Sequence, residues 1–103
     1  MIHQVIILDE EKILRENTYD LQSMWNTIDA LFVQYGLVKT GKGQYEENVN
    51  SSRDGTVDMM MTVFILSKTQ WFMENLKEWF SFEDDEYIDL KNHYLEKKKW
   101  LNR

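Results

Sequence analysis

The sequence predicts a small α+β protein in which a three-stranded antiparallel sheet, of strand order 1-3-2, packs with helices in the order β-α-β-β-α-α. Three observations lead to this fold class. A chain of 103 residues, 43% hydrophobic and 14% aromatic, has room for one domain over residues 1–103 with a single core. Residues 5–8 form a short apolar run typical of a strand, and residues 21–35 show helical spacing of apolar residues.

The first strand is predicted over residues 2–8. Residues 5–8, Val-Ile-Ile-Leu, are apolar on both faces, which favours a central strand over an edge strand. The charged residues 9–12 then form a turn or begin a helix.

The next element is a helix. Its apolar residues recur at spacings of three and four, which places them in one stripe. They are Leu21, Met24, Trp25, Ile28, Leu31, Phe32 and Tyr35. Asn17 or Thr18 can cap its start, and Gly36 can supply the left-handed residue that ends it.

Residues 37–55 are polar and rich in turn-forming residues. We expect a turn at residues 41–43. Residues 44–50 could form a strand with Tyr45 and Val49 on one face, and their polar neighbours make it an edge strand at best.

Residues 56–66 are ambiguous, because three methionines favour a helix whereas residues 62–65 favour a strand. Asp54-Gly55 before this segment is typical of a hairpin turn, so we predict a strand. Ser67 and Gln70 resemble a capping box that opens a helix over residues 68–80. The side chains predicted to point inward from that helix are Trp71, Phe72, Leu76 and Trp79.

A last helix is predicted from residues 82–86 to the C-terminus, with acidic residues at its start and lysines at its end, as the helix dipole favours. Its apolar stripe is Tyr87, Leu90, Tyr94 and Leu101. The first and third strands are apolar on both faces, and one layer of helices can cover only one face of the sheet. Either the last helix or another chain must cover the second face, which predicts dimerisation or a partner.

The residues that usually carry chemistry are few. There is no cysteine, and the two histidines, His3 and His93, are ninety positions apart, so no metal site is predicted. Gly41-Lys42-Gly43 lacks the spacing of a phosphate-binding loop. We therefore expect no catalytic residue, no cofactor and no enzyme activity. Without a leader or a membrane-spanning stretch, the expected location is the cytoplasm.

The charge is unevenly distributed along the chain. The net charge is −6, but residues 1–90 hold seventeen acidic and seven basic side chains, whereas residues 91–103 hold one acidic and five basic ones. The acidic body argues against direct binding of nucleic acid and favours steering towards a basic protein.

Two groups of residues are candidates for binding a partner. They are the carboxylates Glu83, Asp84, Asp85, Glu86 and Asp89, and the aromatics Phe80, Phe82 and Trp100. The leading hypothesis is a stoichiometric inhibitor of a basic nucleic-acid-processing protein, with the carboxylates imitating a row of phosphates.

Two alternatives stay open. One is a structural subunit that homodimerises, and the other is a nucleic-acid-binding accessory protein that uses Lys97, Lys98, Lys99 and Trp100. No motif identifies a family. In composition alone, the chain is similar to inhibitors from phages and mobile elements, including anti-CRISPR proteins, and to bacterial immunity proteins.

Overall fold

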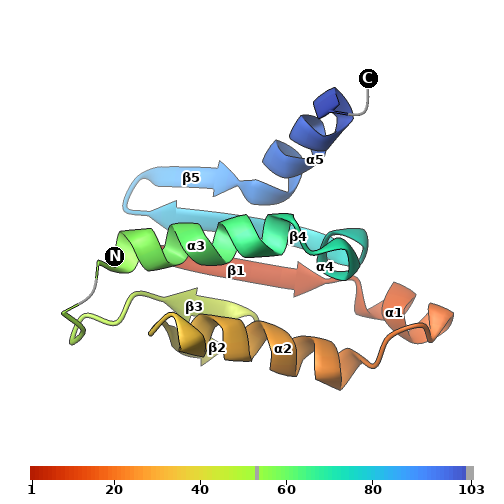
Figure 1. Cartoon of the computed structure of the whole chain (residues 1–103), viewed down its shortest axis with the longest axis horizontal. Coiled ribbons are helices and arrows are strands. Elements are labelled where there is room, and N and C mark those ends of the chain that lie inside the picture. The colour runs from red at the N-terminus through yellow and green to blue at the C-terminus, as the bar shows by residue number, and fades with distance from the viewer. Residues whose placement is uncertain (53, 102–103) are drawn as a thin grey trace.

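The structure is a computed structural model that describes residues 1–52 and 54–101, with side chains described through residue 96. Over these residues the chain forms an α+β fold with five strands and five helices (Figure 1). In chain order they are β1 (His3–Leu8), α1 (Glu10–Glu16), α2 (Leu21–Gln34), β2 (Val38–Gly41), β3 (Gln44–Glu46), α3 (Gly55–Ser67), α4 (Gln70–Glu74), β4 (Leu76–Glu83), β5 (Glu86–Asp89) and α5 (Leu90–Leu101).

The described strands make one antiparallel sheet in the order β2-β3-β1-β4-β5. The predicted three-stranded sheet of order 1-3-2 is therefore wrong. The apolar run in the first strand favoured a central strand, and β1 does lie at the centre of the sheet between β3 and β4, although the predicted order had put it at an edge.

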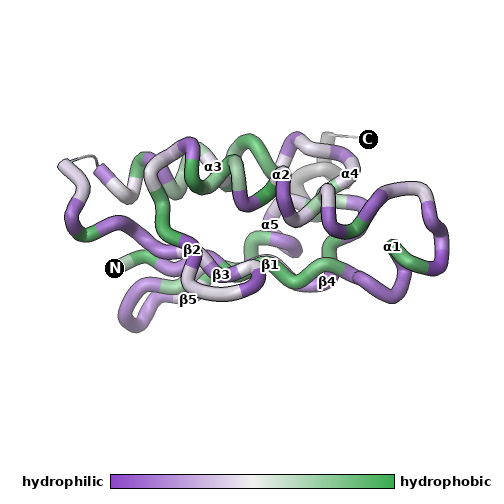
Figure 2. Tube along the Cα trace, turned by 90° about the horizontal axis from the view of Figure 1, so that it is seen from below, coloured by the Kyte–Doolittle hydropathy of each residue, from purple (hydrophilic) through white to green (hydrophobic). Residues whose placement is uncertain are grey.

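The helices form a layer on one side of this sheet. Seen edge-on, α2, α3 and α4 lie together above the strands, and none of the described helices lies below them (Figure 2). α2 lies over the β2–β3 end, and α3 lies over β1 and β4 (Figure 1). The core fills the space between the two layers, and its largest side chains with almost no exposure include Trp79, Tyr45, Phe32, Phe72, Ile6 and Ile28.

A buried polar network joins the two layers. The Gln4 amide nitrogen donates to the Thr62 hydroxyl at 3.2 Å, and the Trp79 indole N–H donates to the Gln4 side-chain oxygen at 2.9 Å. The Thr62 hydroxyl in turn donates to the Met59 carbonyl at 2.8 Å. Buried polar groups must be paired in this way, so the network fixes α3 against β1 and β4.

The predicted helix over residues 21–35 is present as α2, with a different cap. The Asp20 carboxylate accepts a hydrogen bond from the Ser23 N–H, so Asp20 caps the helix rather than Asn17 or Thr18. Asn17 instead ends α1, in the left-handed conformation at φ 50°. Gly36 follows α2 at φ 74°, as its position predicted.

The predicted edge strand over residues 44–50 is shorter, β3 at Gln44–Glu46, and it is an internal strand because β2, which was not predicted, pairs with its outer side. β2 is four residues long and largely exposed, so it carries no alternating pattern. Tyr45 on β3 is buried, whereas Val49 lies beyond the strand and is exposed. The β2–β3 turn passes so close to β1 that a Cβ on Gly43 would lie 2.1 Å from the Ile6 carbonyl oxygen.

The hairpin predicted at Asp54-Gly55 and the strand over residues 56–66 are also wrong. The Asp54 carboxylate accepts from the Thr56 N–H and caps α3. The residues of α3 that are buried follow helical spacing, and they are Asp58, Met59, Thr62 and Leu66. Apolar residues also occupy the outward positions of this helix, so the sequence shows no stripe.

The third error lies in residues 68–89. The predicted helix stops at Glu74, and its second half belongs to β4. The predicted start of the last helix is the β4–β5 hairpin, and α5 begins at Leu90. Both faces of β4 carry aromatic residues, which removes the alternation by which a strand is usually found. Phe72, Leu76 and Trp79 are nevertheless buried, and Trp71 is half-buried.

Candidate functional site

The face of the sheet that no described helix covers is its open face. Side chains alternate along a strand, and Gln4, Ile6 and Leu8 of β1 are buried towards the helices. The alternate side chains of β1 point to the other face, and the strand register places side chains of β4 and β5 beside them on that face. The open face at the β4–β5 end therefore presents His3, Val5, Ile7, Phe80, Phe82 and Tyr87.

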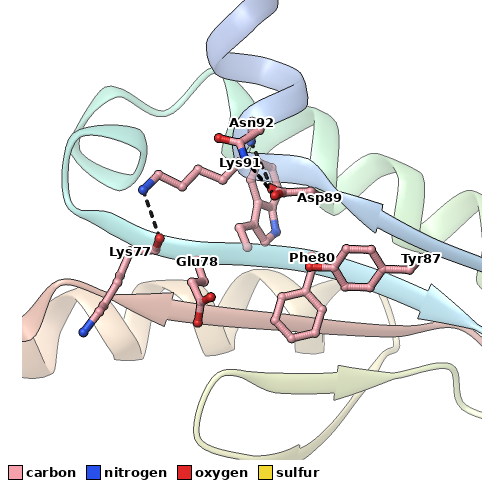
Figure 3. Close-up of a pocket in the computed structure, with 8 residues that line it drawn as sticks. Lys77, Glu78, Phe80, Tyr87, Asp89, Lys91 and Asn92 are labelled. Carbon is pink, nitrogen blue, oxygen red and sulfur yellow. Dashed lines mark hydrogen bonds between the residues drawn. The ribbon is translucent and has the colours of Figure 1, made fainter.

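Four rings on this face form an aromatic patch, consisting of His3, Phe80, Phe82 and Tyr87. The His3 and Phe82 rings are stacked with centroids 4.7 Å apart. The centroid of Phe80 lies 5.4 Å from that of Tyr87 and 6.3 Å from that of Phe82. Phe82 is 37% exposed and Tyr87 is 63% exposed. A close-up shows Phe80 and Tyr87 side by side next to β4 (Figure 3).

A histidine and a carboxylate meet at the margin of this patch. His3 Nδ1 lies 3.4 Å from the Glu46 carboxylate on the neighbouring strand β3, and about a third of each side chain is exposed. Among the described residues, no group of three or more His, Cys, Asp or Glu side chains could hold a metal ion. His93, the other histidine, lies on α5, where its ring meets that of Tyr94 edge to face.

Four of the predicted carboxylates lie at the tip of the β4–β5 hairpin. We call Glu83, Asp84, Asp85 and Glu86 the acidic hairpin. Asp84 has φ 50°, a conformation that a two-residue turn requires and that Asp tolerates better than most residues. Glu83 is paired directly with Glu86 across the hairpin. Like charges in that position destabilise a strand pair, so this arrangement works against the stability of the fold.

The acidic hairpin makes no ion pair with another described residue. The ion pairs found in the described part of the chain lie elsewhere, between Lys12 and Glu16, Lys39 and Asp29, Lys42 and Glu10, and His3 and Glu46.

The fifth predicted carboxylate, Asp89, has a different position. Its side chain accepts from the Asn92 N–H at 3.1 Å and from the Asn92 amide group at 2.8 Å, so it caps the start of α5 (Figure 3). The Lys91 ammonium group donates to the Lys77 carbonyl at 2.9 Å beside it. These contacts surround a hollow of about 160 Å³, and they give Asp89 a structural role that the other four carboxylates lack.

A second apolar surface lies on the other side of β5. A groove of about 300 Å³ runs between α3, β5 and the start of α5, and we call it the α3–β5 groove. Its floor and walls include Met59, Met60, Val63, Phe64, Ile88 and Tyr94. Met60 is 66% exposed, Phe64 49% and Ile88 50%. This groove was not predicted from the sequence, because residues 56–66 were expected to form a strand, although the run of apolar residues there is visible in the sequence.

The structure brings most of the predicted binding residues together. Phe80 and Phe82 lie on the open face, and the acidic hairpin lies at the end of the same two strands. The side chain of Trp100 lies outside the described residues, as do those of Lys97, Lys98 and Lys99. His3 and Tyr87 were not predicted as part of this surface, and they enter it through the register of β1, β4 and β5.

Compared with known proteins, the sequence matches no family model and no curated protein. In the described part of the chain, no helix is both long and apolar enough to cross a membrane.

Proposed function

We propose that this chain is a non-catalytic protein-binding module that holds a basic partner protein against the β4–β5 end of its sheet. The observation that carries the proposal is the aromatic patch on an uncovered sheet face, next to four carboxylates without a cation among the described residues.

The aromatic patch supplies the apolar part of such an interface. Aromatic side chains are enriched in the centres of protein interfaces, where burial of their rings contributes most of the binding free energy. The rings here are held by stacking and by the strand backbone, so little side-chain entropy is lost when a partner covers them.

The acidic hairpin supplies the electrostatic part. A cluster of negative charge next to an apolar patch accelerates encounter with a positively charged protein and disfavours acidic partners. A basic protein also offers lysine and arginine side chains to carboxylates that lack them.

The more specific proposal is a stoichiometric inhibitor, acting in the cytoplasm, whose target is a basic nucleic-acid-processing protein. Closely spaced carboxylates can occupy a groove built for phosphates, because both groups are anionic acceptors. The four carboxylates follow one another at the projecting tip of a hairpin, where they can enter such a groove. Binding of this kind is expected to weaken strongly as salt is added.

The test uses two variants with the same net charge. In the first, the hairpin carboxylates become amides (E83Q, D84N, D85N and E86Q), which preserves shape and turn preference. In the second, four exposed carboxylates on helices are changed in the same way (E11Q, E16Q, E74Q and E96Q). Both are used to capture proteins from a lysate of the organism that encodes the chain, with mass spectrometry as readout.

We expect a basic protein that wild type and the helix variant retain and the hairpin variant loses. The same protein should lose its nucleic-acid-dependent activity when one equivalent of wild-type chain is added. Equal capture by both variants would contradict the proposal.

A homodimer through the open face is the second candidate, and the exposed patch is the observation in its favour. Glu46 and Glu78 share the open face with His3 and Ile7, and the acidic hairpin borders it, so a face-to-face dimer would enclose carboxylates of both copies, which electrostatic repulsion disfavours. We therefore expect sedimentation velocity to show a monomer at high micromolar concentration. A dimer that the Phe82→Ser substitution dissociates would favour the second candidate instead.

A further inference from the structure

β5 forms one edge of the sheet, and no other strand pairs with its outer side among the described residues (Figure 1). All four of its residues are exposed. An edge strand presents a row of unpaired N–H and C=O groups, which can pair with the backbone of another extended chain. The outer side of β5 is therefore open to pairing with a strand of another chain.

The hairpin geometry identifies the free groups. Residues that face each other in an antiparallel pair alternate between hydrogen-bonded and non-hydrogen-bonded positions. Glu83 and Glu86 close the two-residue turn and are a hydrogen-bonded pair, so Phe82 and Tyr87 are the next, non-hydrogen-bonded pair. The N–H and C=O groups of Tyr87 consequently point away from β4 and towards solvent, and the N–H of Asp89 does the same, whereas the C=O of Asp89 belongs to the first turn of the helix that this residue caps.

Both sides of this edge are apolar. On the open face, Tyr87 extends the aromatic patch through Phe80. On the helix side, Ile88 borders the α3–β5 groove opposite Met60 and Phe64. The two apolar surfaces of the molecule therefore meet at β5, and a strand placed beside it would cover part of each.

We propose that β5 is a strand-addition site, at which an extended segment of the basic partner pairs as an additional edge strand. The inference rests on the proposed function and names the manner of binding. Alternate side chains of the added strand lie against the aromatic patch and against the α3–β5 groove, because successive side chains of a strand point to opposite faces. Lysine or arginine residues at its ends pair with the acidic hairpin.

Charge selects this partner over a second copy of the chain. Each copy of β5 carries the acidic residues Glu86 and Asp89 and follows the acidic hairpin, so two copies that paired edge to edge would bring like charges close together. Like charges close together across a strand pair destabilise it, so β5 disfavours itself and favours a segment with basic ends.

The experiment uses the full chain and a synthetic peptide, Lys-Arg-Val-Phe-Val-Ile-Lys-Arg, as the probe. Amide hydrogen exchange is followed by NMR with and without the peptide. We expect slower exchange at Tyr87 and Asp89, by about tenfold when the free peptide is at ten times its Kd. A peptide with glutamate in place of lysine and arginine is expected to give no protection at these amides.

Two changes remove the backbone pairing itself. Tyr87→Pro deletes an outward N–H at an edge position where proline is tolerated, and Tyr87→Ala is its matched control for loss of the ring. At saturating peptide, we expect the proline variant to lose protection at Asp89, and the alanine variant to keep it with a weaker affinity because the ring of the aromatic patch is gone. A peptide N-methylated at alternate residues makes the same test on the wild-type chain, where folding of the variant is not at issue.

Protection confined to other residues, or equal binding of the acidic or N-methylated peptide, would overturn strand addition. That result would leave the proposed function standing if the hairpin amide variant still lost the partner protein. If the hairpin variant kept the partner while the basic peptide protected β5, the proposed function would fail and the strand-addition site would remain.

Discussion

The two ends of the sheet use similar residues for different purposes. At the β2–β3 end, the Tyr45 hydroxyl donates to the Asp29 carboxylate of α2 at 2.5 Å, and its ring stacks on Phe32 with centroids 3.7 Å apart. At the β4–β5 end, Tyr87 is exposed on the open face. The comparison shows that one tyrosine contributes to the stability of the fold, while the other leaves apolar surface available to a partner.

The two edge strands differ in the same sense. β2 has an irregular register between Lys39 and Gly41, and the Lys39 ammonium group pairs with Asp29 at 2.9 Å. Bulges and lysines are the devices by which natural sheets discourage unwanted pairing. β5 is regular in register and lacks lysine, and its own charged residues, Glu86 and Asp89, are acidic. Of the two edge strands, only β5 therefore lacks these devices, as the proposed strand addition requires.

The largest effect is expected from truncating the two tyrosines in turn. Tyr45→Ala removes a buried ring and leaves a cavity, so the free energy of unfolding should fall by about 3–5 kcal/mol. Tyr87→Ala removes an exposed ring and should change it by no more than about 0.5 kcal/mol. Urea denaturation measures both. Similar losses in the two variants would refute the division between the ends.

A smaller loss in the free energy of unfolding is expected from a substitution on the central strand β1, where it meets the helix layer. Gln4→Leu leaves the Trp79 indole N–H without an acceptor, and each buried polar group left unpaired costs about 1–3 kcal/mol. Gln44→Leu, on the exposed side of β3, is the matched control and should stay within about 0.5 kcal/mol of wild type. If the two leucine variants unfolded at the same urea concentration, the buried network would have no role in stability.

The Tyr45 hydroxyl should also make stability depend on alkaline pH. Burial, together with the hydrogen bond to Asp29, raises the pKa of Tyr45 above its ordinary value of 10. The folded protein therefore keeps this proton when the unfolded chain loses it, and stability present below pH 10 is lost progressively as the pH rises above that value. Tyr45→Phe should cost about 1 kcal/mol at pH 7 and give a flatter decline above pH 10. Parallel curves for wild type and variant would contradict this reasoning.

The same contrast explains what the sequence could predict. α2 and β1 were found because each has a clear local pattern, an apolar stripe for α2 and an unbroken apolar run at residues 5–8 for β1. α3 and β4 were misassigned because apolar side chains lie on surfaces that no described part of the chain covers, such as Met60 and Phe82. A pattern of period 3.6 or 2 is visible only when the outward positions are polar. The misassignments of α3 and β4 therefore coincide with the candidate binding surface, whereas the missed strand β2 lies at the other end of the sheet.

The site itself was predicted in part. Phe80 and Phe82 were chosen because they did not fit a helical stripe, and the reason is that they belong to the outward face of a strand. The acidic residues were attributed to a helix start because a run of carboxylates suits a helix dipole as well as a hairpin tip. His3 joins Phe82 only through a pairing between residues far apart in the chain, which no local pattern contains.

The smallest effect concerns the acidic hairpin and has the opposite sign. Glu86→Gln removes one of two like charges that face each other across the hairpin, so the protein should become more stable by about 0.2–1 kcal/mol at low salt. The gain should shrink as salt screens the repulsion between Glu83 and Glu86 in wild type. Urea denaturation at low and high salt measures the difference, and Glu74→Gln is the control for a single lost charge on a helix. A hairpin that becomes less stable would mean that the carboxylates support the fold. A gain in stability accompanied by loss of the basic partner would show that this end of the sheet is built for binding at the expense of stability.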